Sequence, residues 1–258
     1  MRELAVGLAA SLALTASSAA GQVLELRQYK IVEGKRDAFV SLFEREFVES
    51  QEDTGLRLVG QFRDLDDPNR FTWLREFPDA AVRAPALTAF YTGPLWRRLR
   101  SEANGLLADN NNVLLLKPAG PGHGLPRGAD RAAVGAAPRP GGLIVANLWR
   151  LWVEPDAAFA ERFEREVKPE LEAAGLPVIG AYLPVRESNA FPALPVREGE
   201  KVFVWFARAD SAQAYAAALE RLEARPGWKA RVAPLLADQL ESPPVVRRLA
   251  PTPRSALR

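Results

Sequence analysis

The segment Phe43-Glu44-Arg45-Glu46 returns 120 positions later as Phe163-Glu164-Arg165-Glu166. The same offset places Ala38-Phe39 on Ala158-Phe159 and Gly55-Leu56 on Gly175-Leu176. Matches that keep one offset over several motifs indicate an internal repeat, in which each copy is one structural unit. We therefore expect two tandem copies of one module in this chain.

The offset between the copies grows to 132 further along, where Trp73 falls on Trp205 and Trp96 on Trp228. The extra residues of the second copy lie in the proline-rich stretch between Tyr182 and Lys201. A loop between two strands can lengthen at little cost in free energy, so we expect this insertion to be a long hairpin loop.

Local periodicity predicts the elements of each module. Leu24 to Lys30 alternates apolar and polar residues, which is the pattern of a strand. Phe39, Leu42, Phe43 and Phe47 recur at helical spacing, which predicts an amphipathic helix over about residues 35–52. The same reasoning along both copies predicts strands at 24–30, 56–60, 71–76, 113–116, 144–152, 176–182, 201–208 and 245–249, and helices at 35–52, 79–107 with a break near Gly93-Pro94, 155–174, 211–225 and 228–239.

A β-α-β-β-α-β order gives an α+β module, a four-stranded antiparallel sheet with helices on one face. The other face of the sheet stays partly apolar, with rings such as Phe71 or Trp73, and such a face is not stable in water. We expect the sheets of the two copies to pack face to face and close a barrel-like core within the chain. Pairing between two chains is the alternative, and further oligomerisation is left open.

The ends and the middle of the chain suggest domain boundaries. Arg2 precedes an apolar run from Leu4 to Ala16, and the small residues Ser18 and Ala20 follow it, as in a secretory signal peptide cleaved after Ala20. The alternatives are a short N-terminal helix or an uncleaved anchor. The predicted divisions are a signal peptide (1–20), the first module (21–118), a flexible Gly/Pro-rich linker outside the core (119–142), the second module (143–251) and a disordered tail (252–258). The protein is accordingly predicted to be periplasmic or secreted.

Composition excludes several classes of site. The chain has no cysteine, and its one histidine, His123, lies in the predicted linker. Disulfides, thiolate metal sites, histidine-ligated heme and a Ser-His-Asp triad are therefore not expected. The net charge of +2, with both signs interspersed, does not favour nucleic acid. We expect no cofactor, no metal and no membrane span after the leader, and we expect a small molecule as the partner.

Polar residues that occur only in the first copy indicate where a single site would lie. Asn147 stands in the second copy where Arg27 stands in the first. An arginine beside a cavity binds a carboxylate or enolate through two donors, and a tyrosine can donate or accept a proton. The candidate ligand-binding residues are Arg27, Asn69, Arg70 and Tyr91, with Trp73, Arg75, Trp96, Asp109 and Asn112 as secondary candidates.

Each candidate also has a structural interpretation. Arg27 can be an ion-pair partner within the fold rather than a ligand-binding residue. Trp73 and Trp96 recur in the second copy, as shared core residues would. Asn69 and Arg70 follow Asp67-Pro68 and can simply shape a turn.

Three segments of the first copy form a recognisable pattern: Glu25-Leu26-Arg27-Gln28-Tyr29, Asp67-Pro68-Asn69-Arg70-Phe71-x-Trp73-Leu74-Arg75 and Phe90-Tyr91-x-Gly93-Pro94-x-Trp96. In these segments the first copy resembles the NIPSNAP family. The second copy is more degenerate. The resemblance implies the dimeric α/β-barrel version of the ferredoxin-like fold, here as a pseudo-dimer of two tandem modules. It implies little about chemistry, because the biochemical role of the family is poorly defined.

Two functional hypotheses follow. In the first, the chain binds a small apolar or carboxylated metabolite in the barrel of the first module, with or without catalysis. In the second, it is a non-catalytic interaction or scaffold protein of the cell envelope. A polar and aromatic cavity around Arg27 would favour the first hypothesis, and a filled core the second. The residues do not define a reaction.

Overall fold

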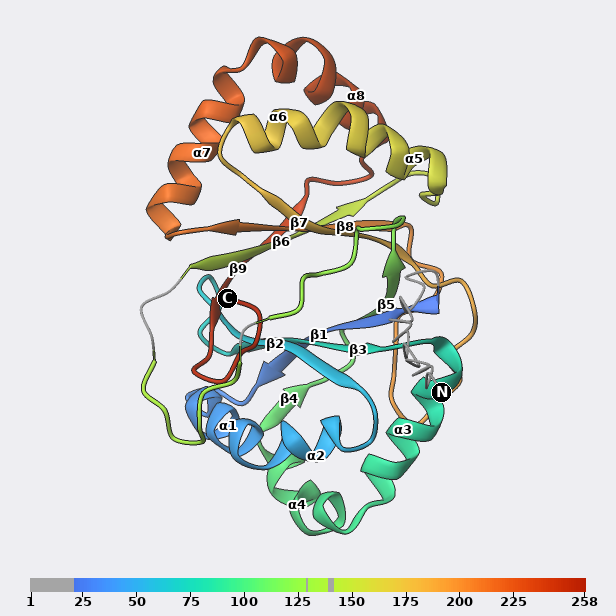
Figure 1. Cartoon of the computed structure of the whole chain (residues 1–258), viewed down its shortest axis with the longest axis vertical. Helices are drawn as coiled ribbons and strands as arrows, with labels where there is room; N and C mark the ends of the chain where they lie inside the picture. The colour runs from blue at the N-terminus through green and yellow to red at the C-terminus, as the bar shows by residue number, and fades with distance from the viewer. Residues whose placement is uncertain (1–20, 129, 139–141) are drawn as a thin grey trace, which may run out of the picture.

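The structure is a computed structural model that describes residues 21–128, 130–138 and 142–258. Helices cover two opposite sides of a central barrel of strands (Figure 1). The elements of the first half are β1 (Val23–Ile31), α1 (Arg36–Leu42), the π-helical turn η2 (Phe43–Phe47), α2 (Glu49–Glu52), β2 (Arg57–Asp64), β3 (Arg70–Phe77), α3 (Ala80–Thr92), α4 (Pro94–Gly105), β4 (Leu107–Asp109) and β5 (Val113–Pro118).

The second half runs through nearly the same order of elements. They are β6 (Leu143–Arg150), α5 (Ala157–Arg162), the π-helical turn η3 (Phe163–Val167), α6 (Lys168–Ala173), β7 (Val178–Pro184), β8 (Val202–Ala209), α7 (Ala212–Ala224), the π-helical turn η4 (Trp228–Val232), α8 (Ala233–Gln239) and β9 (Val245–Pro251). A π-helical turn interrupts the first helix of each half at the same place. The predicted break of the second helix lies between α3 and α4, where Gly93 is extended and Pro94 begins the next helix.

Eight of the strands form one closed antiparallel barrel. They follow the order β3-β2-β9-β6-β8-β7-β5-β1, and β1 pairs back onto β3, while the short β4 extends the end of β1. Each half contributes four neighbouring strands, and the pairs β2–β9 and β5–β7 join the halves. The expectation of an α/β barrel closed within one chain is confirmed.

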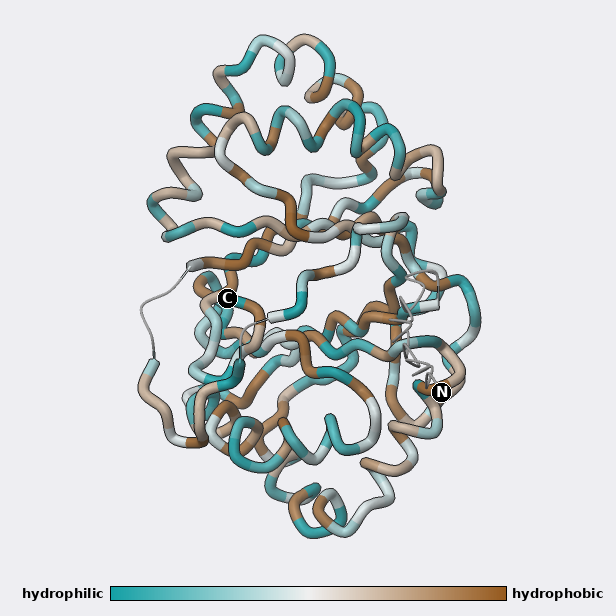
Figure 2. The backbone as a smooth tube through the Cα atoms, in the orientation of Figure 1, coloured by the Kyte–Doolittle hydropathy of each residue, from teal (hydrophilic) through white to brown (hydrophobic). Residues whose placement is uncertain are grey.

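Three apolar cores follow from the alternation of side chains along the strands. On β1, Leu24 and Leu26 point into the barrel, whereas Val23 and Tyr29 point toward the helices of the first half. The helix-facing side of the second half has its own core around Trp149. Figure 2 shows hydrophobic stretches running along the strands of the barrel, while the helices alternate in polarity. Both faces of the sheet are therefore buried, one by the barrel and one by helices.

The prediction of a flexible linker outside the core at 119–142 is wrong for its described part. Leu125 is buried in the core of the barrel, and its backbone N–H donates to the Tyr182 hydroxyl at 2.7 Å. Ala119 N–H donates to the Ala181 carbonyl at 2.9 Å, which extends the pairing of β5 with β7. Glycine and proline mark irregular backbone, but they do not show whether a segment packs on the fold.

The prediction of a disordered tail at 252–258 is also wrong. β9 pairs with β2 only from Phe62 to Asp64, which leaves the earlier carbonyls of β2 without a strand partner. The tail supplies their donors: Thr252 N–H donates to Gln61 and Leu257 N–H to Val59, each at 2.9 Å. Buried backbone groups need such partners, which explains why a short Pro/Arg-rich end is ordered here.

The predicted signal peptide, residues 1–20, lies outside the described residues. None of the described helices combines the length and the apolar character that a membrane span requires.

Candidate functional site

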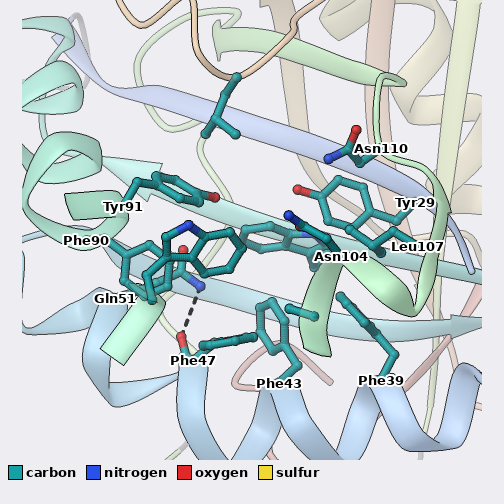
Figure 3. Close-up of a pocket in the computed structure, with 14 residues that line it drawn as sticks. Tyr29, Phe39, Phe43, Phe47, Gln51, Phe90, Tyr91, Asn104, Leu107 and Asn110 are labelled. Carbon is teal, nitrogen blue, oxygen red and sulfur yellow. Dashed lines mark hydrogen bonds between the residues drawn. The ribbon is translucent and has the colours of Figure 1, made fainter. Parts of the chain in front are cut away.

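A narrow cavity of about 40 Å³ lies between the sheet of the first half and its helices. Figure 3 shows the side chains that line it. The cavity is on the helix-facing side of β1 and β3, not inside the barrel, where the sequence predicts the site. The barrel interior is instead packed with apolar side chains such as Leu24, Leu26 and Phe62.

Aromatic rings form most of the cavity wall. They come from α1 and η2, from β3, and from α3 and α4: Phe39, Phe43, Phe47, Trp73, Phe90, Tyr91 and Trp96. The Phe43 and Trp73 ring centroids are 5.0 Å apart, and those of Tyr91 and Trp96 are 4.9 Å apart, both edge to face. Such edge-to-face contacts hold rings in fixed orientations, so the wall is rigid and apolar.

Two hydroxyl groups face each other across this apolar wall. Those of Tyr29 and Tyr91 point into the cavity from opposite sides, and the amides of Asn104 and Asn110 lie on the Tyr29 side (Figure 3). The Tyr29 oxygen accepts a hydrogen bond from Arg27 Nε at 2.8 Å. Its own hydrogen is therefore available to a ligand in the cavity. Burial raises the pKa of Tyr29, although Arg27 partly offsets this, so the hydroxyl keeps its proton at neutral pH.

A buried ion cluster lies behind the cavity wall, with Glu25 at its centre. The Glu25 carboxylate accepts from Arg75 Nε at 2.6 Å, from Arg27 Nη1 at 2.7 Å and from Arg83 Nε at 2.7 Å. Glu25, Arg27 and Arg75 have no exposed surface, and Arg83 is nearly as buried. Three guanidinium groups share one carboxylate, so two positive charges of the cluster are not compensated within it.

The electrostatics of the cluster keep Glu25 and Arg27 charged. Burial by itself would raise the pKa of Glu25, but the three guanidinium groups hold that pKa far below its usual range. Burial would lower the pKa of Arg27, but Tyr29 and Glu25 raise it above its usual value. The Nη2 atom of each arginine is buried and has no hydrogen-bond partner among the residues that the structure describes. Buried donors of this kind are rare in proteins and call for a bound water, ion or ligand.

The ion cluster and the cavity share their dividing wall. The Arg27 guanidinium carbon lies 5.3 Å from the centroid of the Tyr29 ring and 5.5 Å from that of Trp73. The Arg75 guanidinium carbon lies 5.0 Å from the Trp73 centroid and 6.0 Å from that of Tyr91. Gln51, which also lines the cavity, accepts from Arg75 Nη1 at 2.9 Å. A single layer of aromatic rings therefore separates the uncompensated positive charge from the cavity.

The second half of the chain lacks this ion cluster at the matching positions of its strands. Glu25 pairs with Arg75 across β1 and β3, and Arg27 pairs with Trp73. The matching pairs across β6 and β8 are Val145 with Ala207 and Asn147 with Trp205. Arg83 lies four residues after the N-cap of α3, and the residue at this position of α7 is Tyr215. Gln51 lies four residues after the end of η2, and the residue at this position after η3 is Leu171. An apolar core fills that place, so the fold itself does not need the charges.

The structure divides the candidates predicted from the sequence. Tyr91, Trp73 and Trp96 line the cavity, and Arg27 and Arg75 belong to the ion cluster. That any of them touches a ligand stays a prediction.

The other four candidates lie elsewhere. Asn69 Oδ1 accepts from Gly34 N–H at 3.2 Å, and Arg70 pairs with Asp67 at 3.0 Å, so both shape the turn before β3. Asp109 is exposed and accepts from Asn111 N–H. Asn112 lines a separate hollow of about 180 Å³ at one end of the barrel.

Among the residues of the site that sequence reasoning missed are Tyr29, Glu25, Gln51 and Arg83. A signal existed for the first two, because Glu25, Arg27 and Tyr29 occupy alternate positions of one strand and therefore share a face. A charge on a strand face that is otherwise apolar is a strong indication of a buried pair. Gln51 and Arg83 lie on helices, where a polar residue by itself indicates nothing.

A metal site is not apparent in the described part of the chain. There, no group of three or more His, Asp or Glu side chains is placed to hold a metal ion. His123 Nε2 lies 2.8 Å from a carboxylate oxygen of Glu164, and neither residue lines the cavity.

Comparison with known protein families finds a match in the first half of the chain. Residues 24–121 match the model of the family described as NIPSNAP, so the predicted resemblance is confirmed for this segment. A NIPSNAP-like domain protein from Burkholderia xenovorans is 24% identical over 37% of this chain and 82% of its own, with a TM-score of 0.33. No curated protein sequence matches the chain.

Several solved structures match nearly the whole chain, two of them as follows. A proposed monooxygenase from Lactobacillus acidophilus aligns with 90% of this chain and 94% of its own, at a TM-score of 0.53 and 12% identity. A proposed monooxygenase from Fusobacterium nucleatum aligns with 90% of this chain and 93% of its own, at a TM-score of 0.53 and 10% identity. At such identities the likeness concerns the fold alone.

Proposed function

We propose that the NIPSNAP domain of residues 24–121 binds a small acid with an apolar body in the cavity between its sheet and its helices. The aromatic wall takes the apolar part of the ligand. Tyr29 and Tyr91 donate hydrogen bonds to its acidic oxygens, and the ion cluster supplies the positive potential. No reaction is assigned, because donors and rings bind and orient a ligand without defining a chemical step.

The single observation that carries this proposal is the uncompensated charge of the ion cluster. Two excess guanidinium charges in a buried place are unfavourable unless a further negative group approaches them. The cavity is the adjoining space, and its Tyr29 hydroxyl oxygen accepts from Arg27, which leaves the hydroxyl hydrogen available to a ligand. A ligand with a carboxylate or a similar anion would supply the missing charge.

The second half supports the proposal as an internal control. Its matching positions hold Val145 and Ala207 in a well-packed apolar core. Replacing a buried ion cluster by apolar residues is often neutral or stabilising, so charges kept in the first half are better explained by ligand binding than by stability. We infer that the halves are two copies of one ferredoxin-like module, arranged as a pseudo-dimer, and that only the first copy has a ligand site.

Calorimetric titration of the purified protein tests the proposal. Propionate and benzoate are compared with their neutral isosteres propionamide and benzamide at neutral pH. We expect each bound acid to bind at least about tenfold more tightly than its amide, because the amide lacks the charge that the cluster attracts. Equal affinity for acid and amide, or no binding by any probe, would refute the proposal.

Tyr29→Phe is the variant that probes the site, and Tyr215→Phe is its matched control. Tyr29→Phe removes one hydroxyl from the cavity, and hydrogen bonds to charged groups contribute about 1.5–3 kcal/mol, so acid affinity should fall roughly tenfold or more. Tyr215→Phe removes a buried hydroxyl from the second half, where no acid should bind, and should leave affinity unchanged. Equal effects of the two variants would assign the acid to another place.

A role as an interaction protein of the cell envelope has one observation in its favour. Trp152 and Val153 are exposed by 59% and 76%, beside a hollow of about 340 Å³. Exposed apolar residues that gather in this way are typical of protein-binding sites. If this role holds, Trp152→Ser should abolish crosslinking to an envelope protein while leaving acid binding intact. Acid binding lost together with crosslinking would argue against two separate roles.

We also propose that the protein is exported, on the basis of residues 1–20 alone. Export predicts that the protein in the periplasmic or culture fraction begins at Gly21. Full-length protein recovered only from the cytoplasm would contradict it.

A further inference from the structure

The long loop between β7 and β8 leaves the second half and crosses onto the first. We name residues 185–201 the strap. Its two ends are fastened to β5 of the first half, because Val185 N–H donates to the Leu115 carbonyl and Arg197 N–H donates to the Val113 carbonyl, each at 2.9 Å. The matching connection of the first half, between β2 and β3, is short. The strap is therefore the insertion that distinguishes the second half, and it lies over the candidate site.

Asn189 holds the strap in one conformation and joins it to the ion cluster. Its side-chain oxygen accepts from Arg83 Nη1 at 2.8 Å and from Phe191 N–H at 3.1 Å. Its side-chain nitrogen donates to the Leu194 carbonyl at 2.8 Å. One amide thus fixes the path of the strap on both sides of Phe191 and anchors it to Arg83.

The apolar side chains of the strap close the cavity. Phe191 stacks on Tyr91, with ring centroids 6.0 Å apart and an angle of 28° between the planes. Leu194 is 8% exposed and is the strap residue that lines the cavity. The remaining space, about 40 Å³, is far below the roughly 300–1,000 Å³ of pockets that hold drug-sized ligands. Any larger ligand needs a wall residue to move.

The geometry points to Leu194 as the residue that determines which size of acid the cavity admits. The other side chains of the wall lie on or directly beside helices and strands, and their rings pack against one another. Leu194 lies on a loop without regular secondary structure, so its displacement or truncation leaves the barrel and the helices in place. The ligand class therefore depends on a residue of the second half. This inference rests on the proposed function and extends it.

The test compares Leu194→Ala with the wild-type protein, using propionate as the small acid and benzoate as the larger one. Val196→Ala is the matched control, because Val196 packs against the same core from the same strap without lining the cavity. Leu194→Met, which nearly conserves volume, checks that any effect comes from size. Circular dichroism and thermal unfolding establish that each variant is folded.

We expect the ratio of benzoate affinity to propionate affinity to rise at least about tenfold in Leu194→Ala, because small changes in an apolar pocket discriminate ligands by about 10–200-fold. Val196→Ala and Leu194→Met should keep the wild-type ratio. An unchanged ratio in Leu194→Ala, with acids still preferred over amides, would overturn the role of Leu194 and leave the proposed function standing. If neither acid binds any of the four proteins, both proposals are refuted.

Discussion

Glu25→Gln is the most informative single change in this molecule, because one carboxylate holds three arginines. The substitution preserves the shape of the side chain and removes its charge. Three hydrogen bonds of 2.6–2.7 Å from guanidinium groups end on that carboxylate. The variant leaves three buried positive charges facing a neutral amide, which can accept at only one oxygen.

The expected loss of stability is large. Removing one partner of a buried ion pair destabilises a protein by about 3–5 kcal/mol, because an uncompensated charge remains. Glu25 has no exposed surface, so bulk water does not screen the guanidinium charges that remain in the folded variant. In a chain of this length each kcal/mol shifts the melting temperature by about 2–4 °C, so we expect Tm to fall by about 6–20 °C.

Urea unfolding and calorimetry of the two proteins at neutral pH measure this loss. Glu154→Gln is the control, because Glu154 pairs with Arg186 at 2.8 Å and both of these side chains are exposed. The control should lose at most about 1 kcal/mol, as solvent-exposed pairs do. A loss below about 1 kcal/mol for Glu25→Gln would show that the cluster is not the electrostatic centre described above.

Three further predictions concern the cluster and the tail. The first replaces the cluster by the matching residues of the second half (E25V, R27N, R75A and R83Y together). This variant should stay folded with a similar urea midpoint but lose its preference for acids over amides. An unfolded variant would contradict the argument that the second half is an internal control. Because the folded-state pKa of Glu25 is lowered, its contribution to stability is complete above the unfolded pKa of about 4.3 and is lost as pH falls toward the folded pKa. The gap in unfolding free energy between wild type and Glu25→Gln should therefore narrow only below about pH 4.3, and a gap that narrows between pH 8 and 6 would refute this assignment. Deleting residues 252–258 should lower the unfolding free energy by roughly 2–5 kcal/mol, since Leu257 leaves the core and two β2 carbonyls lose their donors; an unchanged urea midpoint would count against it.

The two wrong predictions about the linker and the tail have one cause. Both segments are rich in glycine, proline or arginine, and several of their backbone hydrogen bonds are made with distant strands. Amino-acid composition reveals the glycine, proline and arginine content of a segment, but it does not reveal hydrogen bonds to distant strands. Leu125 and Leu257 are single apolar residues in such segments, too few to produce any periodic pattern.

Sequence by itself determined the order of strands and helices, the similarity between the halves and the break at Gly93, because these depend on periodicity and chain geometry within short windows. The site depended on tertiary structure. Arg75 lies 50 positions from Glu25, Arg83 lies 58 positions from Glu25, and the amide of Asn189 lies 106 positions from Arg83. Only the register of β1 against β3, and the passage of the strap over the first half, bring these groups together. A charge cluster assembled from such separations leaves no local pattern, because each member looks like an ordinary polar residue among its own neighbours in the chain.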